Sequence, residues 1–94
     1  MEFREGMVVF SKAGHDAGSY YMVVQCGSKC CWIADGRRRR VEAPKRKNHL
    51  HLAATSHLID RAEVTSNRKL RQLLARWNNQ TPTESRREVF CYNG

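Results

Sequence analysis

Acidic residues are scarce in this chain of 94 amino acids, which holds nine Asp and Glu against seventeen Lys and Arg. The formal net charge is +8, so the protein attracts polyanions, chiefly nucleic acid or anionic lipid. A solvated surface that keeps the protein soluble and monomeric is the alternative explanation. The distribution favours a polyanion site, because residues 37–47 hold seven basic residues and a single acid, Glu42.

Long apolar runs are missing as well. No stretch approaches the roughly 18 apolar residues that a membrane-spanning helix needs. The first residues, Met1–Glu5, carry charges of both signs and lack the apolar core of a secretory signal. We therefore expect a cytoplasmic protein that makes no membrane contact. A chain of 94 residues suffices for one domain and leaves little room for a deep substrate pocket.

Paired metal ligands are also absent from the sequence. No CxxC pair is formed by the four cysteines, which are Cys26, Cys30, Cys31 and Cys91. Reduced thiols are the expected state in a chain without a secretory signal. A metal site would need these thiols to converge with His49, His51 or His57, and the Cys26-x3-Cys30 spacing is loose for structural zinc. We expect neither a metal nor another cofactor.

No constellation of residues points to catalysis. The pair His15-Asp16 could orient an imidazole, but neighbours in a turn more commonly form local turn hydrogen bonds. A cysteine nucleophile with a histidine base would lack a cleft in which to work. We expect no catalytic residues. An enzyme or a metal sensor that uses the histidines and cysteines is kept as an alternative, ranked below the two binding functions described at the end of this section.

β-branched and aromatic residues are concentrated in two early runs, Met7–Ser11 and Tyr20–Gln25. Such residues suit the pleated, half-buried surface of a strand. The segment between them, Lys12–Ser19, contains Gly14 and Gly18, which can adopt a positive φ at no steric cost. The pattern predicts two strands joined by a loop that turns sharply twice.

Three more strands are predicted downstream. Lys29–Ala34 is rich in residues that suit strands, and the Asp-Gly pair after it matches a two-residue hairpin turn. Arg37–Glu42 would then return as the fourth strand. The alternation His-Leu-His-Leu predicts a fifth strand within Asn48–Ala54. Five short antiparallel strands indicate a small barrel of the SH3-like type over residues 1–55.

The hydrophobic period changes from strand-like to helical near residue 66. An amphipathic helix over Asn67–Asn78 is indicated by apolar residues at i, i+3, i+4 and i+7, namely Leu70, Leu73, Leu74 and Trp77. Thr65 or Ser66 can cap its start. The sequence Thr-Pro-Thr-Glu from Thr81 predicts a second short helix, Pro82–Phe90. The expected fold is α+β and mainly β, with residues 56–94 packing as a helical extension on the barrel within one structural domain.

The glycine pattern of the first two runs resembles a KOW motif, the strand–loop–strand signature of a family of small RNA-binding barrels. The order is Gly6, an apolar run, Ala13-Gly14, an acidic residue, Gly18 and a second apolar run. The stretch Ala34–Leu52 resembles the second half of the KOW-type large-subunit ribosomal proteins of archaeal and eukaryotic type. It is more similar still to their small bacterial relatives, the KOW-domain RNA-binding proteins.

The resemblance covers residues 6–52 and implies a barrel that binds RNA, with ribosomal RNA as its target. It implies that Lys12–Ser19 is the KOW loop and that residues 37–40 and 45–47 form the basic surface. One departure is Ala17, where many members carry a basic residue before the loop glycine. The candidate RNA-binding residues are Lys12, His15, Gly18, Tyr20, Arg37, Arg38, Arg39, Arg40, Lys45, Arg46, Lys47 and His49.

Four consecutive arginines predict a phosphate-binding arm. On a strand, residues 37 and 39 would lie on one face and residues 38 and 40 on the other. The planar fork of arginine makes bidentate contacts to phosphate. Protection of an edge strand against aggregation is the alternative, although it rarely needs four arginines followed by Lys-Arg-Lys.

Aromatic side chains offer a further route to RNA, because Tyr20, Tyr21 and Trp32 could stack on bases. Only one of the two tyrosines can belong to the core, since neighbours on a strand point to opposite faces. The main alternative function is a protein-interaction module, in which the two predicted helices dock to a ribosomal or transcription-complex protein. We expect a monomer that binds RNA or the ribosome.

Overall fold

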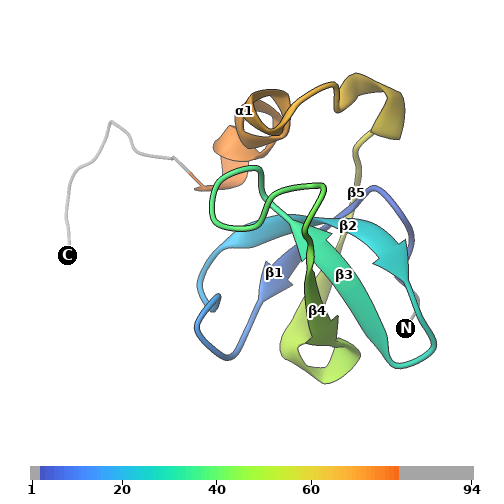
Figure 1. The fold of residues 1–94 in the computed structure, drawn as a ribbon. Coiled ribbons are helices and arrows are strands. Elements are labelled where there is room, and N and C mark those ends of the chain that lie inside the picture. The colour runs from blue at the N-terminus through green and yellow to red at the C-terminus, as the bar shows by residue number, and fades with distance from the viewer. Residues whose placement is uncertain (1–2, 79–94) are drawn as a thin grey trace, which may run out of the picture.

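The computed structural model describes residues 3–78. Its elements are β1 (Met7–Ser11), β2 (Tyr20–Cys26), β3 (Cys30–Ala34), β4 (Lys45–Asn48), the 3-10 helix η1 (His49–His51), β5 (Leu52–Leu58), the 3-10 helix η2 (Arg61–Glu63) and α1 (Asn67–Asn78). The strands form one antiparallel five-stranded sheet in the order β4-β3-β2-β1-β5 (Figure 1). The described chain is therefore mainly β, and the sheet is compatible with a small barrel-like fold.

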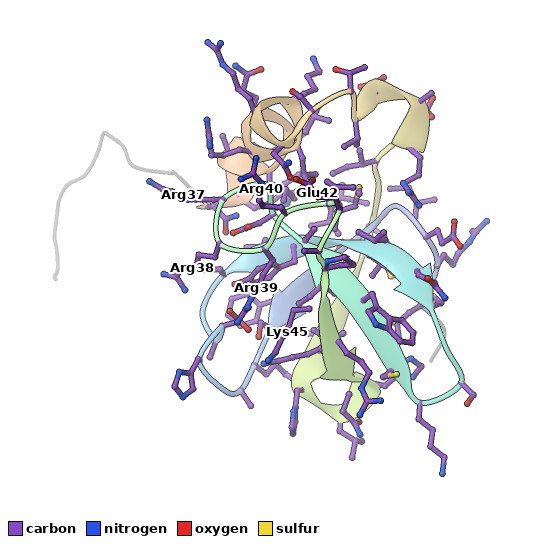
Figure 2. The ribbon with its side chains drawn as sticks, viewed as in Figure 1. Arg37, Arg38, Arg39, Arg40, Glu42 and Lys45 are labelled. Carbon is purple, nitrogen blue, oxygen red and sulfur yellow. The ribbon has the colours of Figure 1, made fainter. Side chains whose placement is uncertain are left out.

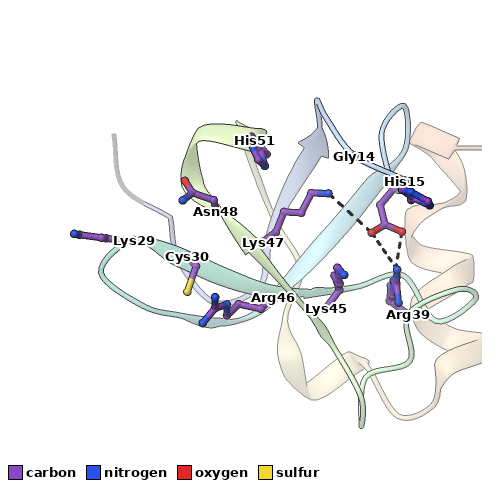
Figure 3. A pocket seen from close by; sticks show the side chains of 11 residues that line it. Gly14, His15, Lys29, Cys30, Arg39, Lys45, Arg46, Lys47, Asn48 and His51 are labelled. Carbon is purple, nitrogen blue, oxygen red and sulfur yellow. Dashed lines mark hydrogen bonds and ion pairs between the residues drawn. The ribbon is translucent and has the colours of Figure 1, made fainter.

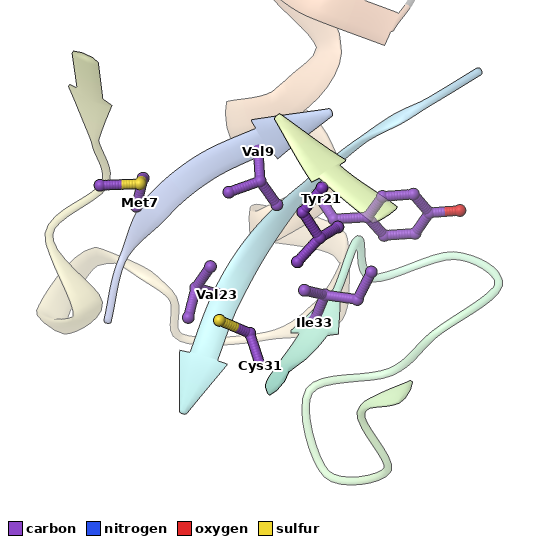
Figure 4. Close-up of a cluster of buried hydrophobic side chains, with 7 residues drawn as sticks. Met7, Val9, Tyr21, Val23, Cys31 and Ile33 are labelled. Atoms are coloured by element: carbon purple, nitrogen blue, oxygen red, sulfur yellow. The ribbon is translucent and has the colours of Figure 1, made fainter. Parts of the chain in front are cut away.

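The central strands β1 and β2 are buried on both faces, which explains why their sequences are nearly continuous apolar runs. Alternate residues point to opposite faces of a strand, so each strand serves two cores. The first core cluster, drawn in Figure 4, is formed by Met7, Val9, Tyr21, Val23, Cys31, Ile33 and Leu52. The second core cluster lies on the other face and joins Val8, Met22 and Ala34 to two leucines of α1.

Helix α1 covers the outer face of the sheet through its apolar stripe, as the sequence predicts. Leu70 and Leu74 are buried in the second core cluster, and Trp77 packs at its margin. The hydroxyl of Ser66 accepts a hydrogen bond from the Lys69 N–H at 3.1 Å, which confirms the predicted cap. The predicted helix Pro82–Phe90 lies outside the described residues. None of the helices within 3–78 has the length and apolar character needed to cross a bilayer.

The loop between β1 and β2 turns where its glycines allow it. Gly14 has φ of 85° and Gly18 has φ of 92°, in the left-handed region that side chains other than glycine disfavour. The backbone N–H groups of Ser11 and Gly18 donate to Ser19 and Ser11, at 3.0 and 2.9 Å, and close the loop. The predicted strand–loop–strand arrangement is therefore confirmed.

The predicted fourth strand, Arg37–Glu42, is wrong. Backbone N–H groups of this segment donate hydrogen bonds to the side chain of Asp35 and do not pair with a neighbouring strand. One carboxylate oxygen, Oδ1, accepts hydrogen bonds from the N–H groups of Arg37 and Arg39 at 2.9 and 3.0 Å. The N–H groups of Asp35 and Gly36 both donate to the Arg39 carbonyl. These bonds fold residues 35–43 into a compact loop, which we call the arginine loop. Strand β4 therefore begins only after this loop and spans Lys45–Asn48.

The predicted fifth strand, Asn48–Ala54, is wrong in its first half. The Asn48 side chain accepts a hydrogen bond from the Leu50 N–H at 2.8 Å and starts the 3-10 helix η1. The alternating His-Leu-His-Leu is thus helical at its start, and Leu50 is 79% exposed. Strand β5 begins only at Leu52, where the chain pairs with Ser11 of β1.

Candidate functional site

A groove of about 840 Å³ lies beside strand β4. Its walls come from the β1–β2 loop, the start of β3, the arginine loop and η1 (Figure 3). The lining carries five cationic side chains and one carboxylate: Lys29, Arg39, Lys45, Arg46, Lys47 and Asp16. Such an excess of one charge in a concave surface focuses the field and concentrates anions there.

The carboxylate of Asp16 is only 3% exposed and is engaged by two of these cations. Its two oxygens accept hydrogen bonds from Nε and Nη2 of Arg39, each at 3.3 Å. The Nζ of Lys47 lies 4.0 Å from Oδ2 of the same carboxylate. Because Asp16 compensates Arg39 and Lys47, these two predicted RNA-binding residues are structural cations in the floor of the groove.

Lys47 is buried because strand β4 turns it toward the first core cluster, where it pairs with Cys31 of β3. A buried ammonium needs a partner, and Asp16 is that partner. The lysine tip passes so close to Gly14 that a Cβ there would lie 2.7 Å from Nζ. The sequence shows Lys45–Lys47 as a uniform basic run, whereas the fold separates its members.

The remaining cations of the groove are exposed and available. The side chains of Lys29, Lys45 and Arg46 form no ion pair or hydrogen bond with any of the described residues. The groove therefore combines a floor in which Asp16 pairs with two cations, leaving one net positive charge, with a positive rim that has no acidic partner. Lys29 and Asn48 were not predicted as site residues, since the turn that brings Lys29 beside the end of β4 is visible only in the fold.

The arginine loop is held against α1 and does not project as a free arm. The Asn67 side-chain oxygen accepts the Val41 N–H at 2.8 Å, and its amide donates to Glu42 at 2.9 Å. Val41 packs on the second core cluster. Glu42 also pairs with Arg40 at 3.1 Å on the surface. The hydrogen bond from Asn67, supported by a backbone hydrogen bond and by Arg40, holds the pKa of Glu42 below its ordinary value.

The arginines of this loop consequently face different surroundings (Figure 2). Arg37 and Arg38 are exposed and have no side-chain partner among the described residues. Arg39 is turned to Asp16, and Arg40 is paired with Glu42. Four consecutive arginines therefore supply two uncompensated charges at the tip of the loop.

The remaining predicted site residues are divided between the groove and other surfaces. His15 lines the groove, whereas Lys12 and Gly18 are exposed in the same loop outside its lining. Tyr20 lies on the α1 side, with its ring 5.0 Å from that of Phe10. The ring of His49 contacts that of Phe3 in a tilted arrangement, with the ring centres 4.6 Å apart, and its buried Nε2 has no partner within residues 3–78.

Beneath the groove, the first core cluster holds two titratable groups in their neutral forms. Burial, with Asp16 and Asp35 nearby, raises the pKa of Tyr21 to about 12. Burial and the neighbouring Cys26 raise the pKa of Cys31 to about 12. The Tyr21 hydroxyl donates to the Asp16 carbonyl at 3.3 Å, so the core tyrosine also anchors the β1–β2 loop. Tyr21 therefore belongs to the first core cluster, whereas Tyr20 points to the opposite face and packs half-buried against the second core cluster.

The thiols in the described part of the chain are free, and those of Cys26 and Cys31 lie 3.9 Å apart. Cys91 lies outside the described residues. No three His, Cys, Asp or Glu side chains between residues 3 and 78 come together as a metal-binding group.

Comparison with known proteins does not identify the chain. No protein-family model matches it, and no curated protein matches it either. Its function is therefore inferred from the charge, shape and contacts of the groove and of the arginine loop.

Proposed function

We propose that this protein binds RNA, with ribosomal RNA or the ribosome as its partner. The observation that supports this most is the uncompensated rim of the groove, formed by Lys29, Lys45 and Arg46. Arg37 and Arg38 extend the positive surface beyond the groove on the adjoining loop. The resemblance of residues 6–52 to KOW motifs supports the same function and an SH3-like barrel as its scaffold.

The chemistry of the groove suits the backbone of RNA. Lysine and arginine bind phosphate oxygens and release the counterions condensed on the polymer, so the affinity falls as salt rises. Phosphate contacts position a protein on RNA but carry no sequence information. We therefore propose that the protein recognises the shape and phosphate spacing of a structured RNA.

The preformed floor favours this binding mode. Asp16 holds Arg39 and Lys47 in place before any ligand arrives, so the groove needs no ordering of its base. The exposed side chains above it are long and adaptable, which suits a polymer with evenly repeated charge. Among residues 3–78, no acidic side chain other than Asp16 lines the groove.

A second candidate function, docking to a ribosomal or transcription-complex protein, is favoured by a separate surface. A hollow of about 410 Å³, with as many polar as apolar residues in its lining, lies between the end of β5 and α1. Leu58, which is 54% exposed, and the half-buried Trp77 line it. Exposed apolar side chains of this kind are typical of protein contacts.

Matched charge reversals on the rim and on α1 test the RNA-binding function. Arg46→Glu removes a rim cation, so we expect RNA affinity to fall about tenfold and the salt slope to drop by about 0.7–0.9 per lost contact. Arg68→Glu makes the same charge change on the exposed face of α1 and should have a much smaller effect. Fluorescence anisotropy with a labelled RNA hairpin at several KCl concentrations measures both quantities.

Two outcomes would count against the proposal. Equal losses in both variants would mean a general attraction to polyanions without a defined groove. An absence of RNA binding by the unaltered protein would favour the second candidate function, docking of a protein partner at the hollow between β5 and α1. Circular dichroism of each variant shows whether the fold is retained.

A further inference from the structure

A second, much smaller cavity lies on the other side of the arginine loop, where the loop meets α1. Its volume is about 100 Å³, against about 840 Å³ for the groove. Two segments distant in sequence bring three arginines to it. The lining consists of Ser19, Asp35, Arg37, Arg38, Arg71 and Asn78.

The three guanidinium groups of this cavity are uncompensated within the described chain. Some of the other arginines have acidic partners, as Arg39 has Asp16 and Arg61 has Glu5 at 3.4 Å. Arg37, Arg38 and Arg71 have no side-chain hydrogen bond or ion pair with residues 3–78. Like charges repel, so three arginines in the lining of one small cavity favour the binding of an anion there.

The carboxylate in the lining does not cancel this charge. Asp35 is 7% exposed, and its Oδ1 already accepts the N–H groups of Arg37 and Arg39. Its role is to shape the loop. One carboxylate against three guanidinium groups leaves the lining positive.

The cavity is built on rigid contacts. A Cβ on Gly36 would collide with the carbonyl oxygen of Asn67, so the loop lies directly on the first turn of α1. At the other end of the helix, the Asn78 side chain accepts the Tyr20 N–H at 2.8 Å and donates to the Tyr20 carbonyl at 3.0 Å. The loop and the helix therefore hold the backbone positions of the three arginines in a fixed relation, which reduces the entropic cost of binding.

We propose that this cavity is a phosphate seat, defined by Arg37, Arg38 and Arg71, that holds a single backbone phosphate of the RNA bound in the groove. This inference rests on the proposed RNA-binding function. The cavity is smaller than the roughly 300–1,000 Å³ of pockets that enclose whole small molecules, so a phosphate group fits and a nucleotide does not. Guanidinium groups suit phosphate because their paired N–H donors match its oxygens.

The phosphate seat extends the RNA footprint across the arginine loop. Arg39 lines the groove on one side of the loop, and Arg37 and Arg38 line the seat on the other. A strand that occupies both must cross the loop. This explains why the loop is fastened to α1 by Asn67, since a loose loop would not keep the two sites at a constant spacing.

Neutral substitutions at matched positions of α1 test the seat. Arg71→Gln removes one seat cation, whereas Arg68→Gln removes an exposed cation that lines neither cavity. With a labelled RNA hairpin, we expect Arg71→Gln to weaken binding several-fold and to reduce the salt slope by about 0.7–0.9, the value of one phosphate contact. Arg68→Gln should leave the slope unchanged. Arg38→Gln, on the other wall of the seat, should reproduce the Arg71→Gln result.

The rim variant Arg46→Glu separates the failure of this inference from the failure of the proposed function. If the hairpin binds, and Arg46→Glu weakens it while Arg71→Gln and Arg38→Gln keep the full affinity and slope, the seat is refuted and the groove stands. If the unaltered protein does not bind the hairpin, both fail together. Urea unfolding of each variant identifies any loss that comes from the fold.

Discussion

The carboxylate of Asp16 connects the core, the groove and the arginine loop. Its oxygens engage Arg39 and Lys47, and its backbone carbonyl accepts the hydroxyl of Tyr21. The side chains of Asp16 and Lys47 are 4% and 8% exposed, so water screens their interaction little. At the scale of single residues, Asp16 therefore organises the site by positioning its neighbours, although a carboxylate would not itself attract RNA.

We expect Asp16→Asn to destabilise the protein by about 2–4 kcal/mol, because it leaves Lys47 buried without its counter-charge. The one-third exposure of Arg39 limits the loss at that side. Equilibrium unfolding in urea measures the change. The double variant Asp16→Asn/Lys47→Met removes the uncompensated ammonium and should recover part of the lost stability. Unchanged stability of Asp16→Asn would contradict the structural role of this cluster.

The conformation of the arginine loop is determined by side chains that form hydrogen bonds with its backbone N–H groups. Asp35 organises the loop from its start, and Asn67 of α1 fastens its end. Gly36 makes these contacts possible for two reasons. Its φ of 78° lets the chain turn at Asp35, and its lack of a side chain lets the loop touch the helix at Asn67. The loop between β1 and β2 depends on Gly18 in a simpler way, because open space surrounds that residue.

Alanine substitutions at the two glycines should therefore differ in cost. Gly18→Ala adds only backbone strain at a φ of 92°, so we expect a loss of about 1–2 kcal/mol. Gly36→Ala adds the same kind of strain and a collision with Asn67, so we expect about 2–5 kcal/mol. Urea unfolding of the two variants gives the comparison. A Gly36→Ala variant no less stable than Gly18→Ala would show that the loop does not rest on α1.

The sequence predicts those elements whose pattern is local. The apolar runs of β1 to β3 and the stripe of Leu70 and Leu74 in α1 follow from periodicity alone. It mispredicts the arginine loop, because hydrogen bonds from backbone N–H groups to Asp35 outweigh strand pairing there. The burial of Lys47 depends on Asp16, which is distant in the chain, so no local pattern could reveal it.

For the molecule as a whole, the two faces of the sheet have different roles. One face is covered by α1, which completes the second core cluster and supports the arginine loop. The other encloses the first core cluster, with the groove beside β4 at its border. Among the cations of residues 3–78, Arg39, Arg40, Lys47 and Arg61 have acidic partners, whereas the rim cations and the three arginines of the proposed phosphate seat have none.

Recovery of RNA crosslinked to the protein in cells tests the central claim most directly. The matched variant replaces Arg37, Arg38, Lys45 and Arg46 by alanine and spares Arg39 and Lys47, which support the fold. We expect the unaltered protein to enrich one segment of ribosomal RNA and the variant to lose that enrichment. RNA in proportion to its cellular abundance would contradict the ribosomal target, and no recovered RNA at all would contradict the RNA-binding function.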